Sequence, residues 1–533
     1  MKKKFCAGVF KRETKLNAML ATTFTIASVL AAGSAFATDL DLDFAVRIGG
    51  TDTDRAYAIA VDDAGNSYVT GTFADTVDFD PGPGTMDITE GGDDDAYVMK
   101  LDTSGNLVWV QVITGTGTQN GRDIAVDDAG NVYVCGVHWD TTDFDPGPGT
   151  NNIASAGSSD LFVMKLNSTG DLLWARSIGD TGSDRAHSIS LDTNGNVYTT
   201  GQFSNTVDFD PGAGTLNLTS SGNRDIFILK LDADGDLVWA KGVGGTGEDS
   251  GNAIHVDLMG DVYSTGSFEA TVDFDPGAGT VNLSSVSNGD IFVLKLDAAG
   301  DFTWANGMGG THALFSDSGE AITSDASGNV VVTGGFYGTV DFDPGVGVEN
   351  HSSVGEGDLF IHKTNSSGDL IWTKTVGGTL YDLGSGVKVD DTGNIFTTGY
   401  FDESADFDPG AGTFVLSGPA FSRNVFISEL DSAGDFVSAR GFIGTGDSIG
   451  NDIELGSSGS VYVVGSFAET FDFDPGPGDF DLTSNTASKD LFVVKLSPPT
   501  PLLSTSDRFF NSLLVILLLL MGIFLYRKRK FIA

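Results

Sequence analysis

The pentapeptide Asp-Phe-Asp-Pro-Gly (DFDPG) occurs seven times in this chain, and the copies are almost evenly spaced. A fixed period of this kind indicates a repeat protein, in which each unit buries its apolar faces against its neighbours. The function must therefore be inferred from the assembled array rather than from a single motif. Consecutive copies begin 65, 65, 65, 68, 65 and 66 residues apart, at Asp78, Asp143, Asp208, Asp273, Asp341, Asp406 and Asp472.

The repeats fill most of the 533 residues and leave no room for a second fold. The chain contains 72 glycines, and no segment of the array has a sustained helical period. We therefore expect one all-β domain over residues 38–497.

Each repeat contains four short apolar segments that are rich in β-branched and aromatic residues, which is typical of strands. In the copy that follows Gly179 these segments are SISL, NVYTTGQF, DIFILKL and DLVWAKGV. The first two are joined by Asp-x-x-Gly-Asn, as in Asp62 to Asn66, and the last two by a similar loop, as in Asp102 to Asn106. This pattern predicts hairpin turns with glycine at the position of positive φ. Four strands per repeat would form one antiparallel sheet, or blade.

Tryptophan recurs at one place in the last strand of five repeats. Because most strands are apolar on both faces, we interpret these side chains as packing between blades. An aromatic row that lines a carbohydrate groove is the alternative. The residues concerned are Trp109, Trp174, Trp239, Trp304 and Trp372.

The array begins and ends out of phase. The segment DLDFAVRIGG at Asp41 to Gly50 matches only the last strand of a repeat, and the final repeat ends after DLFVVKL at Asp490 to Leu496, without that strand. We therefore predict that the N-terminal strand (residues 41–49) completes the C-terminal blade and closes a seven-bladed β-propeller. Closure removes the open sheet edges that would otherwise aggregate.

The segments AIAVDDAGNVYVCG and DLFVMKLNSTGDLLWARSIG, with their counterparts in the other repeats, resemble the bacterial seven-bladed β-propeller (SBBP) repeat. The resemblance covers essentially the whole array. It implies a propeller fold in a secreted or surface protein. It implies no catalytic residues, because that family shares no catalytic residue set.

Both ends of the chain carry targeting patterns. Residues 1–37 combine a basic start, an apolar stretch and a final Ala-Phe-Ala, which predicts a secretory signal peptide, with a retained anchor as the alternative. A Pro/Ser-rich linker (498–508) leads to an apolar run (509–526) that is long enough for one transmembrane helix, followed by a basic cytoplasmic tail (527–533). This layout also resembles PEP-CTERM-type sorting tags, although no PEP motif is present. We expect an exported protein at the cell envelope or surface, with a single-pass anchor and the propeller outside the cytoplasm.

The charge of the chain excludes one class of partner. The formal net charge is -44, and residues 38–508 hold 72 of the 73 acidic residues but only 19 of the 29 basic ones. This field repels nucleic acid and favours cations or basic partners. A general contribution to solubility is the alternative.

Each DFDPG segment carries two aspartates whose carboxylates can converge on a hard cation such as calcium, with Cα atoms about 6.6 Å apart along a strand. In the alternative, the second aspartate opens a Pro-Gly turn and the first caps neighbouring backbone, without metal. We expect all seven segments to decorate a single face of the ring. The candidate ligands are Asp78, Asp80, Asp143, Asp145, Asp208, Asp210, Asp273, Asp275, Asp341, Asp343, Asp406, Asp408, Asp472 and Asp474.

The sequence contains no recognisable catalytic constellation. The Gly-Asp-Ser-Ile-Gly segment at Gly446 to Gly450 matches a nucleophile elbow but lacks the strand-turn-helix context. The repeats are nearly identical, whereas an active site needs asymmetric groups, so we expect no enzyme. The longest connection, at Gly309 to Ile322, is the first place to search for a pocket. The six histidines occupy unrelated repeat positions: His138, His187, His255, His312, His351 and His362.

These observations favour a monomeric, exported propeller that acts as a binding, adhesion or interaction module. Its expected partner is an extracellular protein or polysaccharide, and calcium is the one cofactor hypothesis. Two alternatives stay open: an extracellular polysaccharide hydrolase or lyase that uses the propeller axis, and a purely structural envelope scaffold.

Overall fold

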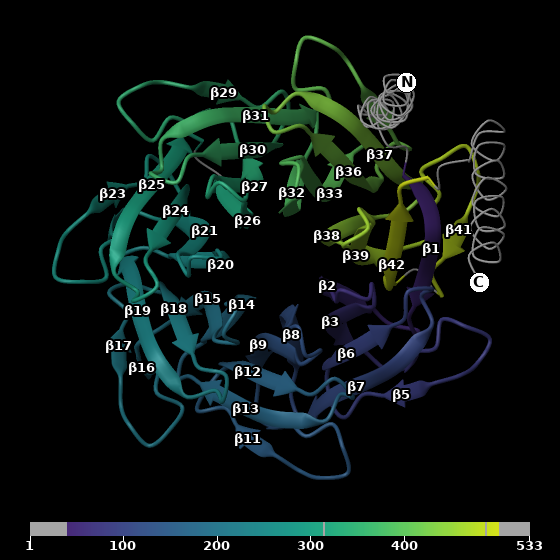
Figure 1. Cartoon of the computed structure of the whole chain (residues 1–533), viewed down its shortest axis with the longest axis horizontal. Helices are drawn as coiled ribbons and strands as arrows, with labels where there is room; N and C mark the ends of the chain where they lie inside the picture. The colour runs from purple at the N-terminus through teal and green to yellow at the C-terminus, as the bar shows by residue number, and fades with distance from the viewer. Residues whose placement is uncertain (1–39, 313–314, 486–487, 500–533) are drawn as a thin grey trace, which may run out of the picture. The chain divides into compact units, whose positions relative to one another are not determined.

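The computed structural model describes residues 40–312, 315–485 and 488–499. These residues form strands and turns without any helix, and the strands build seven antiparallel blades around a central axis (Figure 1). The predicted all-β seven-bladed propeller is confirmed. The predicted signal peptide, apolar run and basic tail lie outside the described residues. Within the described ranges, no helix is long and apolar enough to be a candidate membrane span.

Each blade has four strands, arranged in order from the axis to the outside. From inner to outer strand, the blades are β2 (Arg55–Val61), β3 (Ser67–Phe73), β6 (Asp95–Leu101) and β7 (Leu107–Gly115); β8 (Gln119–Val126), β9 (Val132–His138), β12 (Asp160–Leu166) and β13 (Leu172–Ile178); β14 (Arg185–Leu191), β15 (Val197–Phe203), β18 (Asp225–Leu231) and β19 (Leu237–Gly245); β20 (Ser250–Val256), β21 (Val262–Phe268), β24 (Asp290–Leu296) and β25 (Phe302–Gly310); β26 (Ser318–Ser324), β27 (Val330–Phe336), β30 (Asp358–Thr364) and β31 (Leu370–Gly378); β32 (Asp382–Val389), β33 (Ile395–Asp402), β36 (Arg423–Leu430) and β37 (Phe436–Gly444); β38 (Ser448–Leu455), β39 (Val461–Phe467), β42 (Asp490–Ser497) and β1 (Asp41–Ile48).

The apolar core lies between consecutive blades. One buried cluster, for example, joins Cys135 and Val163 of the second blade to Phe203 and Phe227 of the third. Strands that are apolar on both faces are therefore covered on both sides, as the sequence predicts. The hairpin turns also form as predicted: the Asp62 carboxylate accepts the backbone N–H of Asn66 at 2.8 Å, and Gly65 has φ of 83°.

The N-terminal strand closes the ring. Strand β1 pairs antiparallel with β42, with Ile48 opposite Leu491, and so completes the seventh blade. The Arg47 guanidinium binds the buried Asp490 carboxylate at 2.6 Å across this junction. The predicted closure is confirmed, because the two ends of the array are neighbouring strands of one sheet (Figure 1).

The DFDPG segments form small hairpins outside the four-stranded blades. In five cases the hairpin from one blade pairs with the outermost strand of the preceding blade, as β10 does with β7. The hairpins therefore lie on the outer rim of the ring (Figure 1), and the paired ones meet the last residues of the outer strands, at the same end of the blades. They are β4 (Thr76–Asp78) and β5 (Asp87–Thr89); β10 (Thr141–Asp143) and β11 (Asn152–Ala154); β16 (Thr206–Asp208) and β17 (Asn217–Thr219); β22 (Thr271–Asp273) and β23 (Asn282–Ser284); β28 (Thr339–Asp341) and β29 (Asn350–Ser352); β34 (Ser404–Asp406) and β35 (Val415–Ser417); β40 (Thr470–Asp472) and β41 (Asp481–Thr483).

The physical reason for this position is the fully buried phenylalanine at the centre of each motif. Phe79, Phe209 and Phe274, for example, have no exposed surface. In six of the seven copies this ring packs edge-on against a phenylalanine of its own blade, as Phe209 does against Phe203 at 5.3 Å. In the second copy, Phe144 packs edge-on against His138 at 5.2 Å. Burying this ring draws the hairpin across the neighbouring edge strand, which is thereby covered.

Candidate binding site in the axial channel

A β-bulge interrupts every innermost strand at the same place, beside the axis. The register of β2, for example, shifts between Ala56 and Ala58. A bulge re-aims the side chain of the extra residue and is common next to functional sites. All seven bulged side chains line one channel of about 600 Å³. The bulged residues are Tyr57, Arg122, His187, Asn252, Glu320, Ser385 and Asn451.

This ring of bulged residues corrects the expectation that the repeats are nearly identical. Its seven members include an aromatic residue, a cation, an imidazole, a carboxyl and a hydroxyl, and only asparagine occurs twice. The sequence holds a signal for this ring, because a bulky aliphatic residue such as Ile59 or Ile124 follows each variable residue at a spacing of two. The scaffold is thus repeated while the surface of the channel is not.

Three of the bulged residues hold neighbouring blades together. The Asn252 amide donates to the Gly319 carbonyl of the next blade at 3.2 Å, and the Asn451 amide donates to the Ala56 carbonyl at 2.7 Å. His187 Nδ1 lies 3.1 Å from the corresponding carbonyl of the following blade. These three side chains therefore have a structural role in addition to facing the channel.

Two aspartates that follow bulged residues make the same kind of link. The Asp123 carboxylate accepts bonds from the Ser188 hydroxyl and the Ile189 N–H of the next blade, both at 2.8 Å. The Asp452 carboxylate accepts the N–H of Ile59 at 3.0 Å across the ring closure. Burial raises the pKa of Asp452 to about 7, although the nearby Lys388 ammonium opposes this shift.

A further layer of the channel carries charged and titratable groups. Lys388 forms an ion pair with Glu454 at 2.7 Å, and the carboxylates of Glu454 and Asp452 outweigh burial and raise the pKa of Lys388. His255 Nε2 lies 2.9 Å from the Ser324 hydroxyl, and burial lowers the pKa of this histidine to about 4. The imidazole is therefore neutral at physiological pH.

The remaining bulged side chains present binding groups to the channel. The Arg122 guanidinium lies over the Tyr57 ring, 4.8 Å from its centroid. Glu320 and Ser385 line the opposite part of the ring, and burial raises the pKa of Glu320. A cation, an aromatic face, a carboxyl and a hydroxyl can together recognise a polar ligand.

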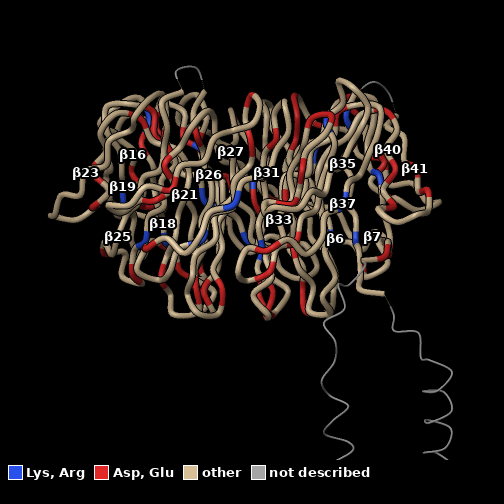
Figure 2. Tube along the Cα trace, turned by 90° about the horizontal axis from the view of Figure 1, so that it is seen from above, with Lys and Arg blue, Asp and Glu red and all other residues tan. Residues whose placement is uncertain are grey.

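The sequence-predicted aspartates of the DFDPG hairpins lie away from this channel. In every copy the first carboxylate accepts two backbone bonds, as Asp208 does from Asp210 and Leu216, and the second accepts the N–H of the glycine two residues on, as Asp210 does from Gly212 at 2.8 Å. This bonding fits the turn-and-cap alternative, and the metal hypothesis stays a prediction. Acidic positions occur on the turns at both ends of the ring (Figure 2). Across the described ranges, no group of three or more metal-ligating side chains comes together.

The other sequence candidates are dispersed. The structure brings His187 and His255 into the channel, whereas His138 is buried beside Thr142 on the rim side. In the long Gly309 to Ile322 connection, Phe315 stacks on Tyr337 with a centroid distance of 5.0 Å. Ser448 of the elbow-like segment begins the innermost strand β38 and is not in a turn between a strand and a helix, so it does not have the geometry of a nucleophile elbow.

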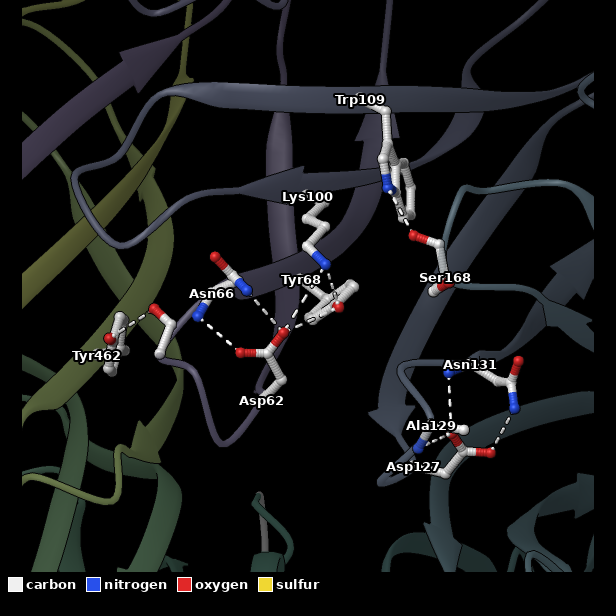
Figure 3. Close-up of polar contacts among 11 residues, drawn as sticks. Asp62, Asn66, Tyr68, Lys100, Trp109, Asp127, Ala129, Asn131, Ser168 and Tyr462 are labelled. Atoms are coloured by element: carbon white, nitrogen blue, oxygen red, sulfur yellow. Dashed lines mark hydrogen bonds and ion pairs between the residues drawn. The ribbon is translucent and has the colours of Figure 1, made fainter.

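The face formed by the Asp-x-x-Gly-Asn turns is fastened from blade to blade (Figure 3). Within the first blade, the Lys100 ammonium lies 2.6 Å from the Tyr68 hydroxyl, which donates to the Asp62 carboxylate. The Trp109 indole donates to the Ser168 carbonyl of the next blade at 3.3 Å. Trp174 lies so close to Gly235 of the next blade that a Cβ there would meet its ring at 2.9 Å. The predicted role of the tryptophans in packing between blades is confirmed.

Seven four-stranded blades closed around an asymmetric channel define a β-propeller repeat protein. The family model for the SBBP beta-propeller repeat matches residues 43–72 and 173–202, so the chain carries repeats of this type, as the sequence resemblance implies.

Two curated relatives are similar over most of this chain. The uncharacterized WD repeat-containing protein L264 of Acanthamoeba polyphaga mimivirus is 22% identical over 505 residues, which cover 81% of this chain and 36% of the relative. The regulatory protein FlaEY of Caulobacter vibrioides is 24% identical over 500 residues, which cover 87% of this chain and 48% of the relative. The chain thus spans less than half the length of either relative.

Solved structures give weaker likenesses. The crystal structure of Sqt1 from Chaetomium thermophilum is 10% identical, covers 87% of this chain and all of that chain, and has a TM-score of 0.37. A protein of unknown function from Bacteroides caccae, also 10% identical, covers 57% of this chain and 78% of that chain, with a TM-score of 0.29. These TM-scores are too low to support any inference about this chain.

Proposed function

We propose that this chain is an exported interaction module that binds its partner in the axial channel. The observation that carries the proposal is the asymmetry of the seven bulged positions within otherwise repeated blades. A channel of about 600 Å³ falls within the usual size range of ligand sites. The names of the two relatives, a WD repeat-containing protein and a regulatory protein, agree with an interaction role.

The channel is better suited to binding than to catalysis. The carboxylates of Asp123 and Asp452 are occupied by the backbone of the next blade, and Lys388 is held by Glu454. The groups that face the channel without such bonds, above all the Arg122–Tyr57 pair, suit recognition. We therefore propose that the protein is not an enzyme.

A hydrolase or lyase that acts on extracellular polysaccharide is the second candidate. Its support is the pKa of Asp452, about 7, which would leave this carboxyl partly protonated near neutral pH and able to exchange a proton.

The proposal includes the location that the sequence predicts. Removal of residues 1–37 and anchoring through 509–526 would place the propeller outside the cytoplasm, in contact with extracellular proteins or polysaccharides. The net charge of -44 disfavours nucleic acid as the partner.

The test uses the purified full chain on an array of polysaccharides and surface proteins. Ser385→Trp fills the channel, and Val346→Trp places the same side chain at a fully exposed position of a rim hairpin loop. We expect Ser385→Trp to abolish binding and Val346→Trp to preserve it. Binding that only Val346→Trp abolishes would contradict the proposal and assign the interaction to the rim. The absence of any binding would favour the scaffold alternative, and depolymerisation of an array sugar would favour the enzyme.

A further inference from the structure

Three arginines lie on the second and third blades, and one of them, Arg122, lines the channel. Arg122 is the bulged residue of β8, Arg185 is the first residue of β14, and Arg224 directly precedes β18. All three positive charges act on His187 and, together with burial, lower its pKa to about 4. Burial lowers the pKa of Arg185, and the positive charges of Arg224 and Arg122 lower it further.

The cation–π and hydrogen-bond partners of Arg122 and Arg185 are aromatic rings and a hydroxyl rather than carboxylates. Arg122 lies over Tyr57, and Arg185 lies 5.9 Å from the centroid of the Trp139 ring. Arg185 Nε donates to the Ser183 hydroxyl at 3.2 Å. Near Arg224, the Glu248 carboxylate accepts a bond from the Asn223 amide at 3.0 Å.

This arrangement runs against the composition of the chain, which has 73 acidic and 29 basic residues. Ten other basic side chains of the described ranges form ion pairs with carboxylates, as in Lys363 with Asp325 at 3.0 Å and Arg423 with Asp402 at 3.2 Å. Across residues 40–312, 315–485 and 488–499, no ion pair joins any of the three arginines to a carboxylate. Clustered like charges destabilise the empty protein, so a missing counter-ion points to a ligand.

We propose that the arginine cluster (Arg122, Arg185 and Arg224) binds the oxyanion group of an acidic ligand at one end of the channel. This inference rests on the proposed function, because it specifies the chemistry of the ligand in that same channel. Guanidinium groups recognise carboxylate, sulfate and phosphate through paired hydrogen bonds. An acidic saccharide and a free inorganic anion share this chemistry.

The experiment is calorimetric titration of the full chain with sodium glucuronate, sodium sulfate and glucose. Ionic strength is held at about 150 mM, where long-range repulsion from the acidic shell is screened within about 8 Å. The variants are Arg122→Gln, Arg185→Gln, Arg224→Gln and the triple combination. Lys241→Gln is the matched control, because it removes one positive charge from the outer strand β19.

We expect glucuronate to bind and glucose not to bind. Each single substitution should weaken glucuronate binding about tenfold or more, because a hydrogen bond to a charged group is worth about 1.5–3 kcal/mol. The triple variant should lose binding, and Lys241→Gln should keep it. Sulfate that binds as tightly as glucuronate would support the site and identify the free oxyanion as sufficient.

Two results would overturn the inference: no heat of binding with either anion, or a triple variant that binds like the wild type. Circular dichroism checks that the variants are folded, and we expect the empty triple variant to melt no lower than the wild type. The proposed function fails separately. Array binding that Ser385→Trp blocks, without any anion binding, would leave the interaction module intact and remove only the arginine site.

Discussion

Raising the pH from 5.5 to 7.5 should destabilise the folded propeller, because buried aspartates next to the innermost strands titrate in this range. Each is at most 3% exposed, and burial raises its pKa above the ordinary value of 3.8. The pKa values are about 7, 6, 6, 7 and 8 for Asp54, Asp184, Asp249, Asp317 and Asp382, respectively.

Asp54 illustrates the sign and the size of the effect of pH on the free energy of unfolding. Its carboxylate accepts the N–H groups of Gly50 at 2.7 Å and Ala74 at 3.1 Å, but burial outweighs these bonds and raises the pKa from 3.8 to about 7. The folded protein therefore holds this proton to a higher pH than the unfolded chain does. Its contribution to the free energy of unfolding is complete below 3.8 and is lost as the pH rises through about 7. Between pH 5.5 and 7.5 the loss is about 2 kcal/mol for this one group.

The assay is urea unfolding at both pH values for the wild type, Asp54→Asn and Asp63→Asn. Asp63 is an exposed turn residue and serves as the control. We expect the wild type and the control to be less stable at pH 7.5, and Asp54→Asn to show a pH dependence that is smaller by about 2 kcal/mol. A wild type that is more stable at pH 7.5, or an Asp54→Asn variant with the full pH dependence, would refute the reasoning.

Two further predictions concern ring closure and the hairpins. Ile48, which is 1% exposed, packs where β1 joins β42. In urea titrations, Ile48→Ala should therefore lower the free energy of unfolding by about 2–5 kcal/mol. A loss below about 1 kcal/mol would mean that ring closure contributes little to stability. Millimolar calcium should leave the melting temperature unchanged, because backbone N–H groups already bond to the Asp78 and Asp80 carboxylates. A rise in melting temperature that Asp80→Asn removes would instead establish a calcium site.

The fold could be predicted from the sequence because its determinants are local and repeated. The turn at Asp62 to Asn66 has one arrangement that satisfies both the aspartate and the glycine, and it recurs in five of the other six repeats; in the seventh, Gly456 replaces the aspartate. Ring closure could be predicted because the strand missing after Leu496 is present at Asp41 to Ile48. Both inferences compare one repeat with another and need no knowledge of distant contacts.

The position of the hairpins and the candidate site could not be predicted in this way. The pairing of β10 with β7 depends on how far one blade reaches over its neighbour, which the repeat pattern does not specify. The residues that line the channel cannot be found in this way, because comparing repeats draws attention to what they share, whereas Tyr57, Arg122 and Glu320 differ between repeats. The bulge that turns these side chains toward the axis is a feature of strand register, which becomes visible only in the paired sheet.

Making the channel symmetric is the most direct test of the claim that its asymmetry creates the binding site. Asparagine already occupies two bulged positions, where it bonds to the backbone of the next blade, so five substitutions would give a uniform ring. We predict an unchanged melting temperature and complete loss of binding on the polysaccharide and protein array. Wild-type binding by this folded variant would contradict the account. The five substitutions are Tyr57→Asn, Arg122→Asn, His187→Asn, Glu320→Asn and Ser385→Asn.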